Sequence, residues 1–209
     1  MNNLKKKLWS QIFIIYTRYL IGSAFVFASL VKISGKRFTA ESGAANAIDS
    51  AWHFFETMYA SGLYWKFIGW AQLLSGLLLM TQRFSKLGAL LNLPIIGNIF
   101  VITLSYYFAY TPVITGLMLI ANLLLIFWEW NELKVIFNLP FEPSDPNRME
   151  RDWFWAFLGL LLFALVIFCK LYLSSQTVPL WFFSFPLVGV LGLLIGVLRE
   201  KKRRKLALD

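Results

Sequence analysis

Residues with redox or metal-binding chemistry are nearly absent from this sequence. The chain has a single cysteine, Cys169, among 209 residues, so an internal disulfide, dithiol redox chemistry and a cysteine metal cluster are excluded. It also has a single histidine, His53, with Asp49 and Glu56 on the same face of a predicted helix. One histidine in this setting is more typical of a solvated helix face than of a metal or proton site. We therefore predict no metal site.

Sequence motifs of catalysis are missing as well. The chain has no phosphate-binding loop, no pair of catalytic carboxylates, no nucleophile with a neighbouring base, no haem ligand pair and no flavin fingerprint. Catalysis by this chain alone is therefore not supported, and a non-catalytic subunit remains the enzyme-related alternative.

Charged residues are scarce and unevenly distributed. Only 15% of the residues are charged, 58% are hydrophobic, and the mean hydropathy is +0.63, which is too apolar for a soluble domain. The formal net charge of +9 arises largely from "KKK" at 5–7 and "REKKRRK" at 199–205, both next to apolar segments. This placement predicts contact with membrane lipids and argues against nucleic acid as a partner.

Long apolar runs dominate the rest of the chain. A helix needs about 20 mostly apolar residues to cross the hydrocarbon of a bilayer. The qualifying segments are 9–31, 64–82, 87–109, 112–130, 153–172 and 178–198. Most connections between them are short, so neighbouring helices should be antiparallel. We predict an all-α polytopic membrane protein, with an antiparallel four-helix bundle followed by two additional C-terminal transmembrane helices.

The distribution of basic residues predicts the orientation of these six helices. If the N-terminus is cytoplasmic, the opposite side carries only Lys32, Lys36, Arg37, Lys66 and Lys170. The excess of Lys and Arg on the other side follows the positive-inside rule. We therefore expect both termini to be cytoplasmic, and the bacterial inner membrane is the expected location.

Two longer connections interrupt the helices. Residues 43–60 repeat apolar residues with helical spacing, which predicts an amphipathic helix that lies on the outer interface or caps the bundle. Residues 137–152 contain three prolines and mixed charge, which predicts an irregular cytoplasmic linker. The expected domains are thus a four-helix unit over 1–136, this linker, and a two-helix extension over 153–209 with a basic tail.

Each of the first four predicted helices carries one strong hydrogen-bonding group near the middle of the membrane. At about 1.5 Å per residue, the predicted depths of Arg18, Gln72, Asn98 and Asn122 are similar. Arginine stays protonated, and no carboxylate is predicted at this depth. Glu129 is expected roughly 10 Å closer to the cytoplasm.

The predicted charge of Arg18 therefore needs a partner. Candidates are Glu129, an internal water, or an anionic or carbonyl-bearing ligand. We predict a ligand-binding site formed by Arg18, Gln72, Asn98, Asn122 and Glu129, because charges inside a membrane usually serve a function. The alternative is an interhelical hydrogen-bond network that only fixes the register of the helices.

Several stretches together resemble the DoxX-like family of small four-helix membrane proteins. They are "RYLIGSAFVFASLVK", "FFETMYASGLYW", "GWAQLLSGLLLMTQRFSKLGALL" and "PIIGNIFVITL", within about residues 14–136. The residues that match the family pattern are Arg18, Gly22, Lys32, Ser61, Gly62 and Gln72. The likeness leaves the last two predicted helices outside.

The resemblance implies an accessory subunit of a membrane oxidoreductase system, with a quinone or a lipid as the ligand and an oxidoreductase subunit as a partner. Family members often have Glu where this chain has Gln72. A neutral amide does not exchange a proton near neutral pH, which argues against a proton-coupled quinone role at that position.

Two other function classes stay open from the sequence. A small transporter or channel would use the polar layer as a pathway, and it would be favoured by an internal repeat or by several titratable groups at that depth. A structural scaffold would use its last two helices to dock a partner. A homo-oligomer is compatible with each of these readings.

Overall fold

The structure is a computed structural model that describes residues 2–141, 148–172 and 178–206, and within these ranges every regular element is a helix. The short elements are α1 (Asn2–Lys6), α3 (Ala51–Ala60), α7 (Trp130–Leu133) and the 3₁₀ helices η1 (Lys134–Phe137) and η2 (Met149–Arg151). The long helices are α2 (Leu8–Ile33), α4 (Leu63–Met80), α5 (Ser85–Ser105), α6 (Thr111–Trp128), α8 (Trp153–Tyr172) and α9 (Val178–Leu206). The predicted all-α class is therefore confirmed for the described residues.

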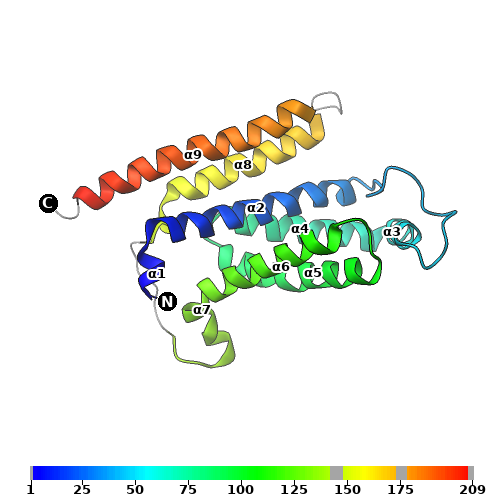
Figure 1. Ribbon diagram of the computed structural model, residues 1–209, viewed down its shortest axis with the longest axis horizontal. Helices are drawn as coiled ribbons and strands as arrows, with labels where there is room; N and C mark the ends of the chain where they lie inside the picture. Colours follow the sequence, from blue (N-terminus) through cyan, green and yellow to red (C-terminus); the bar gives the residue numbers. More distant parts are fainter. Residues whose placement is uncertain (1, 142–147, 173–177, 207–209) are drawn as a thin grey trace.

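Helix α2 lies at the centre of the long helices (Figure 1). On one side it packs against α4 and α6, while α5 packs against both of these helices. On its other side α2 packs against α8, which in turn contacts α9. The Tyr16 hydroxyl donates to the Gly189 carbonyl at 2.6 Å, and the Tyr19 hydroxyl donates to the Trp155 carbonyl at 2.5 Å. The last two long helices thus contact the first four mainly through α2, and α8 also contacts α4.

The long helices run along a common direction, which defines two ends of the molecule (Figure 1). We call the end where α2 begins and α6 finishes the proximal end, and the end where α2 finishes and α6 begins the distal end. The connections at residues 81–84 and 106–110 are short, so α4, α5 and α6 alternate in direction. This agrees with the antiparallel neighbours predicted from the loop lengths.

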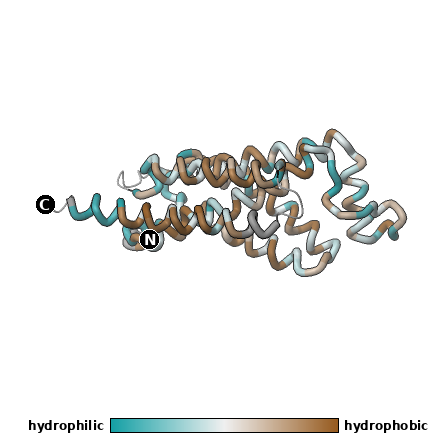
Figure 2. The backbone as a smooth tube through the Cα atoms, turned by 90° about the horizontal axis from the view of Figure 1, so that it is seen from above, coloured by the Kyte–Doolittle hydropathy of each residue, from teal (hydrophilic) through white to brown (hydrophobic). Residues whose placement is uncertain are grey.

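In the described part of the chain, six helices are long and apolar enough to cross a membrane. Figure 2 shows hydrophobic residues along these helices and hydrophilic residues at the C-terminal end of α9. Large apolar side chains are more than half exposed on all of them, including Leu20, Phe67, Val101, Leu117, Phe157 and Leu194. Such a surface is unfavourable in water and favourable in lipid. The fold is consistent with an integral membrane protein.

The final helix is longer than the sequence suggests. The predicted segment ends at 198, whereas α9 continues to Leu206 and extends past the other helices at the proximal end (Figure 1). The added residues are good helix formers. Glu200 also accepts hydrogen bonds from Arg203 at 3.1 Å and from Arg204 at 2.7 Å, which are the spacings that support a helix. The basic tail is therefore helical up to Leu206.

Helices α2 and α4 approach each other backbone to backbone. A Cβ atom on Gly22 would lie 2.9 Å from the Gly76 carbonyl oxygen, and a Cβ on Gly76 would lie 2.8 Å from the Gly22 carbonyl oxygen. Both distances are too short for a real side chain. Small residues at such a crossing allow the close van der Waals packing on which helices in lipid depend.

The amphipathic segment differs from its prediction. The expected helix over 43–60 begins only at Ala51, and residues 43–50 form turns and loop. The Ser50 side chain accepts a hydrogen bond from the His53 amide at 3.2 Å, so Ser50 is the cap that sets the helix start. Ile48, one of the apolar residues of the predicted helix, is 81% exposed. The cap therefore overrides the apolar periodicity before it.

Candidate functional site

The Arg18 side chain is buried in a cluster of charged residues at the proximal end. It is 1% exposed. Its Nη2 donates to Glu129 Oε1 at 2.7 Å, and its Nη1 donates to Gln82 Oε1 at 2.9 Å and to Glu150 Oε2 at 3.3 Å. The expectation that no carboxylate lies at the level of Arg18 is therefore wrong.

A second guanidinium completes this cluster. Arg148 donates from Nη2 to Glu129 Oε1 at 2.8 Å and from Nη1 to Glu129 Oε2 at 3.1 Å, and it also pairs with Glu150. All four charged side chains are at most 8% exposed. Two positive and two negative charges thus compensate one another. We call Arg18, Glu129, Arg148 and Glu150 the charge cluster.

The electrostatics of the charge cluster favour its ionised form. Burial by itself would raise the pKa of Glu129, but the neighbouring Arg18 and Arg148 outweigh burial and hold this pKa below its ordinary value. Burial would likewise lower the pKa of Arg148, while the charges of Glu150 and Glu129 outweigh it and raise that pKa. The two positive and two negative side chains of the charge cluster therefore need no ion from outside the protein.

The register of α2 explains why Arg18 lies near the end of the bundle rather than at its middle. Helix α2 has 26 residues, whereas α4 has 18, and Gly22 packs against Gly76 near the proximal end of α4. The first turns of α2 therefore extend past α4, and Arg18 meets Gln82, which follows α4 in the chain. The depth estimate assumed that all helices begin in one plane. That assumption fails here.

The end of the predicted linker supplies half of the charge cluster. Residues 148–151 fold against α2, where the Met149 amide donates to Gln11 Oε1 at 2.8 Å. Met149 is fully buried. Part of the segment predicted as an irregular linker, 142–147, lies outside the described residues. Residues 149–151 pack against α2 and α8, whereas residues 137–141 are exposed.

Asn122 belongs to a second polar group, deeper between the helices. Asn122 Nδ2 donates to the Ala89 carbonyl at 3.0 Å, Asn92 Nδ2 donates to Asn122 Oδ1 at 3.0 Å, and Ser75 Oγ donates to Asn92 Oδ1 at 3.1 Å. Each of these side chains is fully buried. The three joined helices are α4, α5 and α6. This network has the geometry expected of interhelical hydrogen bonds that fix the register of the three helices.

Sequence reasoning missed Asn92 and Ser75. Asn92 lies six residues before Asn98 on α5, and the depth argument chose Asn98 because it fell closest to the presumed layer. A signal was present in the two amides of one apolar helix, since an Asn inside a membrane helix requires a partner. Sequence alone did not show which amide faces the neighbouring helices.

Gln72 and Asn98 line a cavity in the distal half of the molecule. Its volume is about 440 Å³, and it is not fully enclosed by protein. The walls come from α2, α4, α5 and α6, and the α3 residues Phe55 and Met58 cover its distal end. The lining is largely apolar, with aromatic and aliphatic side chains such as Phe25, Trp65, Ile68, Ile95, Ile99 and Met118.

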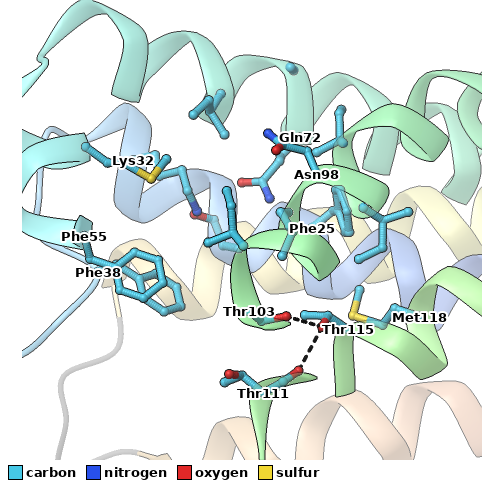
Figure 3. A pocket seen from close by; sticks show the side chains of 18 of the residues that line it. Phe25, Lys32, Phe38, Phe55, Gln72, Asn98, Thr103, Thr111, Thr115 and Met118 are labelled. Atoms are coloured by element: carbon cyan, nitrogen blue, oxygen red, sulfur yellow. Dashed lines mark hydrogen bonds between the residues drawn. The ribbon is translucent and has the colours of Figure 1, made fainter. Parts of the chain in front are cut away.

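The polar lining residues of the cavity come from all four helices. Lys32, Gln72 and Asn98 reach it from α2, α4 and α5 (Figure 3). Gln72 is 2% exposed, and its Oε1 atom has no hydrogen-bond partner among the described residues. On the opposite wall, Thr103 Oγ1 and Thr115 Oγ1 share a hydrogen bond at 2.8 Å. A buried acceptor without a hydrogen-bond partner lowers the stability of the fold. Gln72 Oε1 is therefore an available acceptor in this largely apolar cavity.

Helix α3 covers the distal end of the cavity through aromatic contacts. Trp52 meets Phe108 edge to face with centroids 5.1 Å apart, and Phe54 stacks on Tyr106 at 4.6 Å. None of the α3 side chains is fully buried. Of the two positions predicted for this segment, an interfacial helix or a cap on the bundle, these contacts favour the cap.

The five residues predicted to form one ligand site thus divide among three places. Gln72 and Asn98 line the cavity, Arg18 and Glu129 belong to the charge cluster, and Asn122 belongs to the asparagine network. For the described residues, no group of three or more His, Cys, Asp or Glu side chains could hold a metal ion. Of these three places, the cavity combines a largely apolar lining with a few polar groups.

The fold defines a class of protein: this helical chain is consistent with an integral membrane protein. It has a largely apolar pocket that is open to its surroundings. Comparisons of the chain with protein-family models, with curated proteins and with solved structures find no match.

Proposed function

We propose that this chain is an integral membrane protein of the DoxX-like type that binds a lipophilic ligand, a quinone or a lipid, in the distal cavity. The observation that carries this proposal is the cavity itself. A volume of about 440 Å³ falls within the range of roughly 300–1,000 Å³ that is typical of small-molecule sites. Apolar walls with a few polar groups at fixed positions are also typical of such sites.

The proposed site differs from the one expected around Arg18. Arg18 already donates hydrogen bonds to three protein side chains, those of Glu129, Glu150 and Gln82. Gln82 Nε2 beside Arg18 and Gln72 Oε1 both lack a hydrogen-bond partner among the described residues, but only Gln72 lines the cavity. The polar end of a ligand is therefore better accommodated beside Gln72 and Asn98. The charge cluster holds the segment at 148–151 against α2.

The proposed membrane arrangement places the proximal end in the cytoplasm. In this arrangement α2, α4, α5 and α6 form a four-helix bundle, and α8 and α9 add two further membrane helices. Both termini and the basic end of α9 then face the cytoplasm, where anionic lipids attract them. Helix α3 and the distal cavity lie at the outer side of a bacterial inner membrane.

The proposed role is that of an accessory subunit of a membrane oxidoreductase system. Support for it comes from the DoxX-like sequence pattern around Arg18, Gly22 and Lys32 and from the largely apolar cavity. Catalytic motifs are missing from the sequence, so the redox chemistry would belong to a partner subunit. The ligand would be held here in the membrane close to that partner.

Extraction of ligands from the purified protein tests the proposal. The wild type and two variants are purified in a mild detergent, and bound quinones and lipids are measured by native mass spectrometry. Ala71 lines the cavity, so Ala71→Phe should fill part of it. Ala164 is exposed on α8, so Ala164→Phe is the matched control.

We expect a bound quinone or lipid in the wild type and in Ala164→Phe, and its loss in Ala71→Phe with the fold retained. The proposal fails if Ala71→Phe retains the same bound molecules as the wild type. It also fails if neither an extracted nor an added quinone or lipid binds to the wild type.

A further inference from the structure

Lys32 is a buried cation at the distal side of the cavity. It is 7% exposed, and its Nζ donates to the Ala28 carbonyl at 3.2 Å. The ammonium also lies over two aromatic rings, 5.1 Å from the centroid of Phe38 and 5.0 Å from that of Trp65. A backbone carbonyl and ring faces stabilise a cation only partly. None of these three groups carries a negative charge.

Within the described residues, no carboxylate pairs with Lys32 or lines the cavity. The acidic residue of the covering helix α3, Glu56, is held by Arg37, which donates to both of its oxygens from Nε at 2.9–3.0 Å. Glu56 Oε2 also accepts from the Gly43 amide at 3.1 Å. Lys32 therefore contrasts with Arg18, whose charge is balanced by two carboxylates of the same chain.

Two more cations lie near the distal end of α2. Trp65, whose ring is under the Lys32 ammonium, donates from Nε1 to the Lys36 carbonyl at 3.0 Å. The Lys66 side chain lies beside Gly35, where its Cε would be 3.8 Å from a Cβ atom. Lys36 and Lys66 are both exposed. Lys36 and Lys66 thus add exposed positive charge near the distal end of α2.

Lys32 and Gln72 line the same cavity, about one turn of α4 apart. Lys32 packs against Gly69, because a Cβ on Gly69 would lie 2.9 Å from the Lys32 Cβ. Gln72 follows Gly69 by three residues, about 4.5 Å along α4. The Gln72 amide can donate from Nε2 to the head, and its Oε1 can accept from a ligand hydroxyl.

Resting on the proposed function, we propose that the cavity binds an anionic amphiphile, with a carboxylate or phosphate head at Lys32 and an acyl chain along the apolar walls. An ammonium removed from water is stabilised most by a compensating negative charge. A neutral quinone would satisfy the hydrogen bonds of this site but would leave the charge of Lys32 uncompensated. The charge of the ligand head thus separates the two ligand classes.

Competition binding with a fluorescent fatty acid tests this inference. The purified full chain in a neutral detergent is titrated with cis-parinaric acid. The probe is then displaced by oleic acid, lysophosphatidic acid, oleyl alcohol or decylubiquinone. Oleic acid and oleyl alcohol share one chain and differ in head charge. Inorganic phosphate is added alone to distinguish a free anion from a lipid headgroup.

We expect oleic acid and lysophosphatidic acid to bind at least tenfold more tightly than oleyl alcohol, and phosphate alone not to displace the probe. Lys32→Met should weaken the two acids at least tenfold and leave oleyl alcohol unchanged. Lys32→Arg should retain the preference for acids because it retains the charge. The matched control is Lys170→Met, since Lys170 also lies over a ring, that of Phe27 at 4.3 Å, but is exposed.

The inference is overturned if oleyl alcohol or decylubiquinone binds as tightly as the acids, or if Lys32→Met keeps the preference for acids. Displacement by phosphate alone would assign the site to a free anion instead of an amphiphile, and would also overturn it. Binding of decylubiquinone without the acids leaves the proposed function standing. Failure of every probe to bind to the wild type rejects the proposed function as well.

Discussion

Replacing Glu129 by Gln removes one of the two negative charges from the buried charge cluster. Glu129 accepts hydrogen bonds from Arg18 at 2.7 Å and from Arg148 at 2.8 and 3.1 Å, and it is 3% exposed. After the substitution, Glu150 is the one carboxylate left in the charge cluster for its two buried guanidinium groups. Removing one partner of a buried ion pair costs about 3–5 kcal/mol, a factor of roughly 10²–10⁴ in the unfolding equilibrium.

Titration of the protein from mild detergent into dodecyl sulfate, followed by the loss of helical circular dichroism, measures this change. Glu132→Gln is the matched control, because Glu132 lies three residues further on and pairs with the more exposed Lys86. For this pair we expect a loss of at most about 1 kcal/mol. A loss for Glu129→Gln as small as that of the control would refute the reasoning.

A double variant separates the cost of an unpaired charge from the cost of a lost contact. In Arg18→Met with Glu129→Leu, Arg148 and Glu150 remain as a balanced pair. Replacing a buried ion pair by apolar residues of similar volume is often close to neutral. Gln82 loses its donor, which costs about 1–3 kcal/mol. We therefore expect the double variant to be more stable than Glu129→Gln alone, and the opposite order would contradict the account.

Three further predictions concern pH, packing and topology. The pKa of Glu129 is lower in the folded than in the unfolded chain. The stabilisation that ionised Glu129 contributes is therefore complete above about pH 4.5 and is lost as the pH falls through the folded pKa. Glu129→Gln should therefore flatten the acid limb of a curve of folding stability against pH. Gly76→Ala should destabilise the fold by about 1–3 kcal/mol in the dodecyl sulfate titration. The control Gly97→Ala should be neutral or stabilising, because no atom lies within 4 Å of a Cβ at that position. Equal effects of the two substitutions would exclude the backbone contact of α2 and α4. In a cysteine-free background, a membrane-impermeant maleimide should label Lys36→Cys but not Lys205→Cys in intact cells, and the reverse pattern would invert the proposed topology.

Local features of the fold were predictable because they depend on neighbouring residues. Apolar runs of sufficient length fix the existence of the six long helices, and their boundaries fall within a few residues of the predicted ones except at the end of α9. The start of α3 was not predicted, although the Ser50 cap that sets it is visible in the sequence. Apolar periodicity before Ser50 outweighed the capping signal in the prediction.

The candidate site was predictable only in part. Sequence depth counting identified buried polar residues at four of the five predicted positions, because Arg18, Gln72, Asn122 and Glu129 are at most 3% exposed, whereas Asn98 is exposed. It did not assign them to their groups, because the relative offset of the helices is set by contacts such as Gly22 with Gly76. An error of a few residues in that offset moves a side chain by more than the length of a hydrogen bond.

The sequence by itself determined that this chain has six membrane-compatible helices and that Arg18 must have a partner of opposite charge or a carbonyl, since a guanidinium does not lose its proton. Only the tertiary structure decided which partner that is. Glu150 lies 132 residues from Arg18 in the chain, and it reaches Arg18 because residues 148–151 fold back against α2. The distal cavity and the unbalanced charge of Lys32 likewise arise where four helices and α3 meet. No local pattern encodes such a meeting.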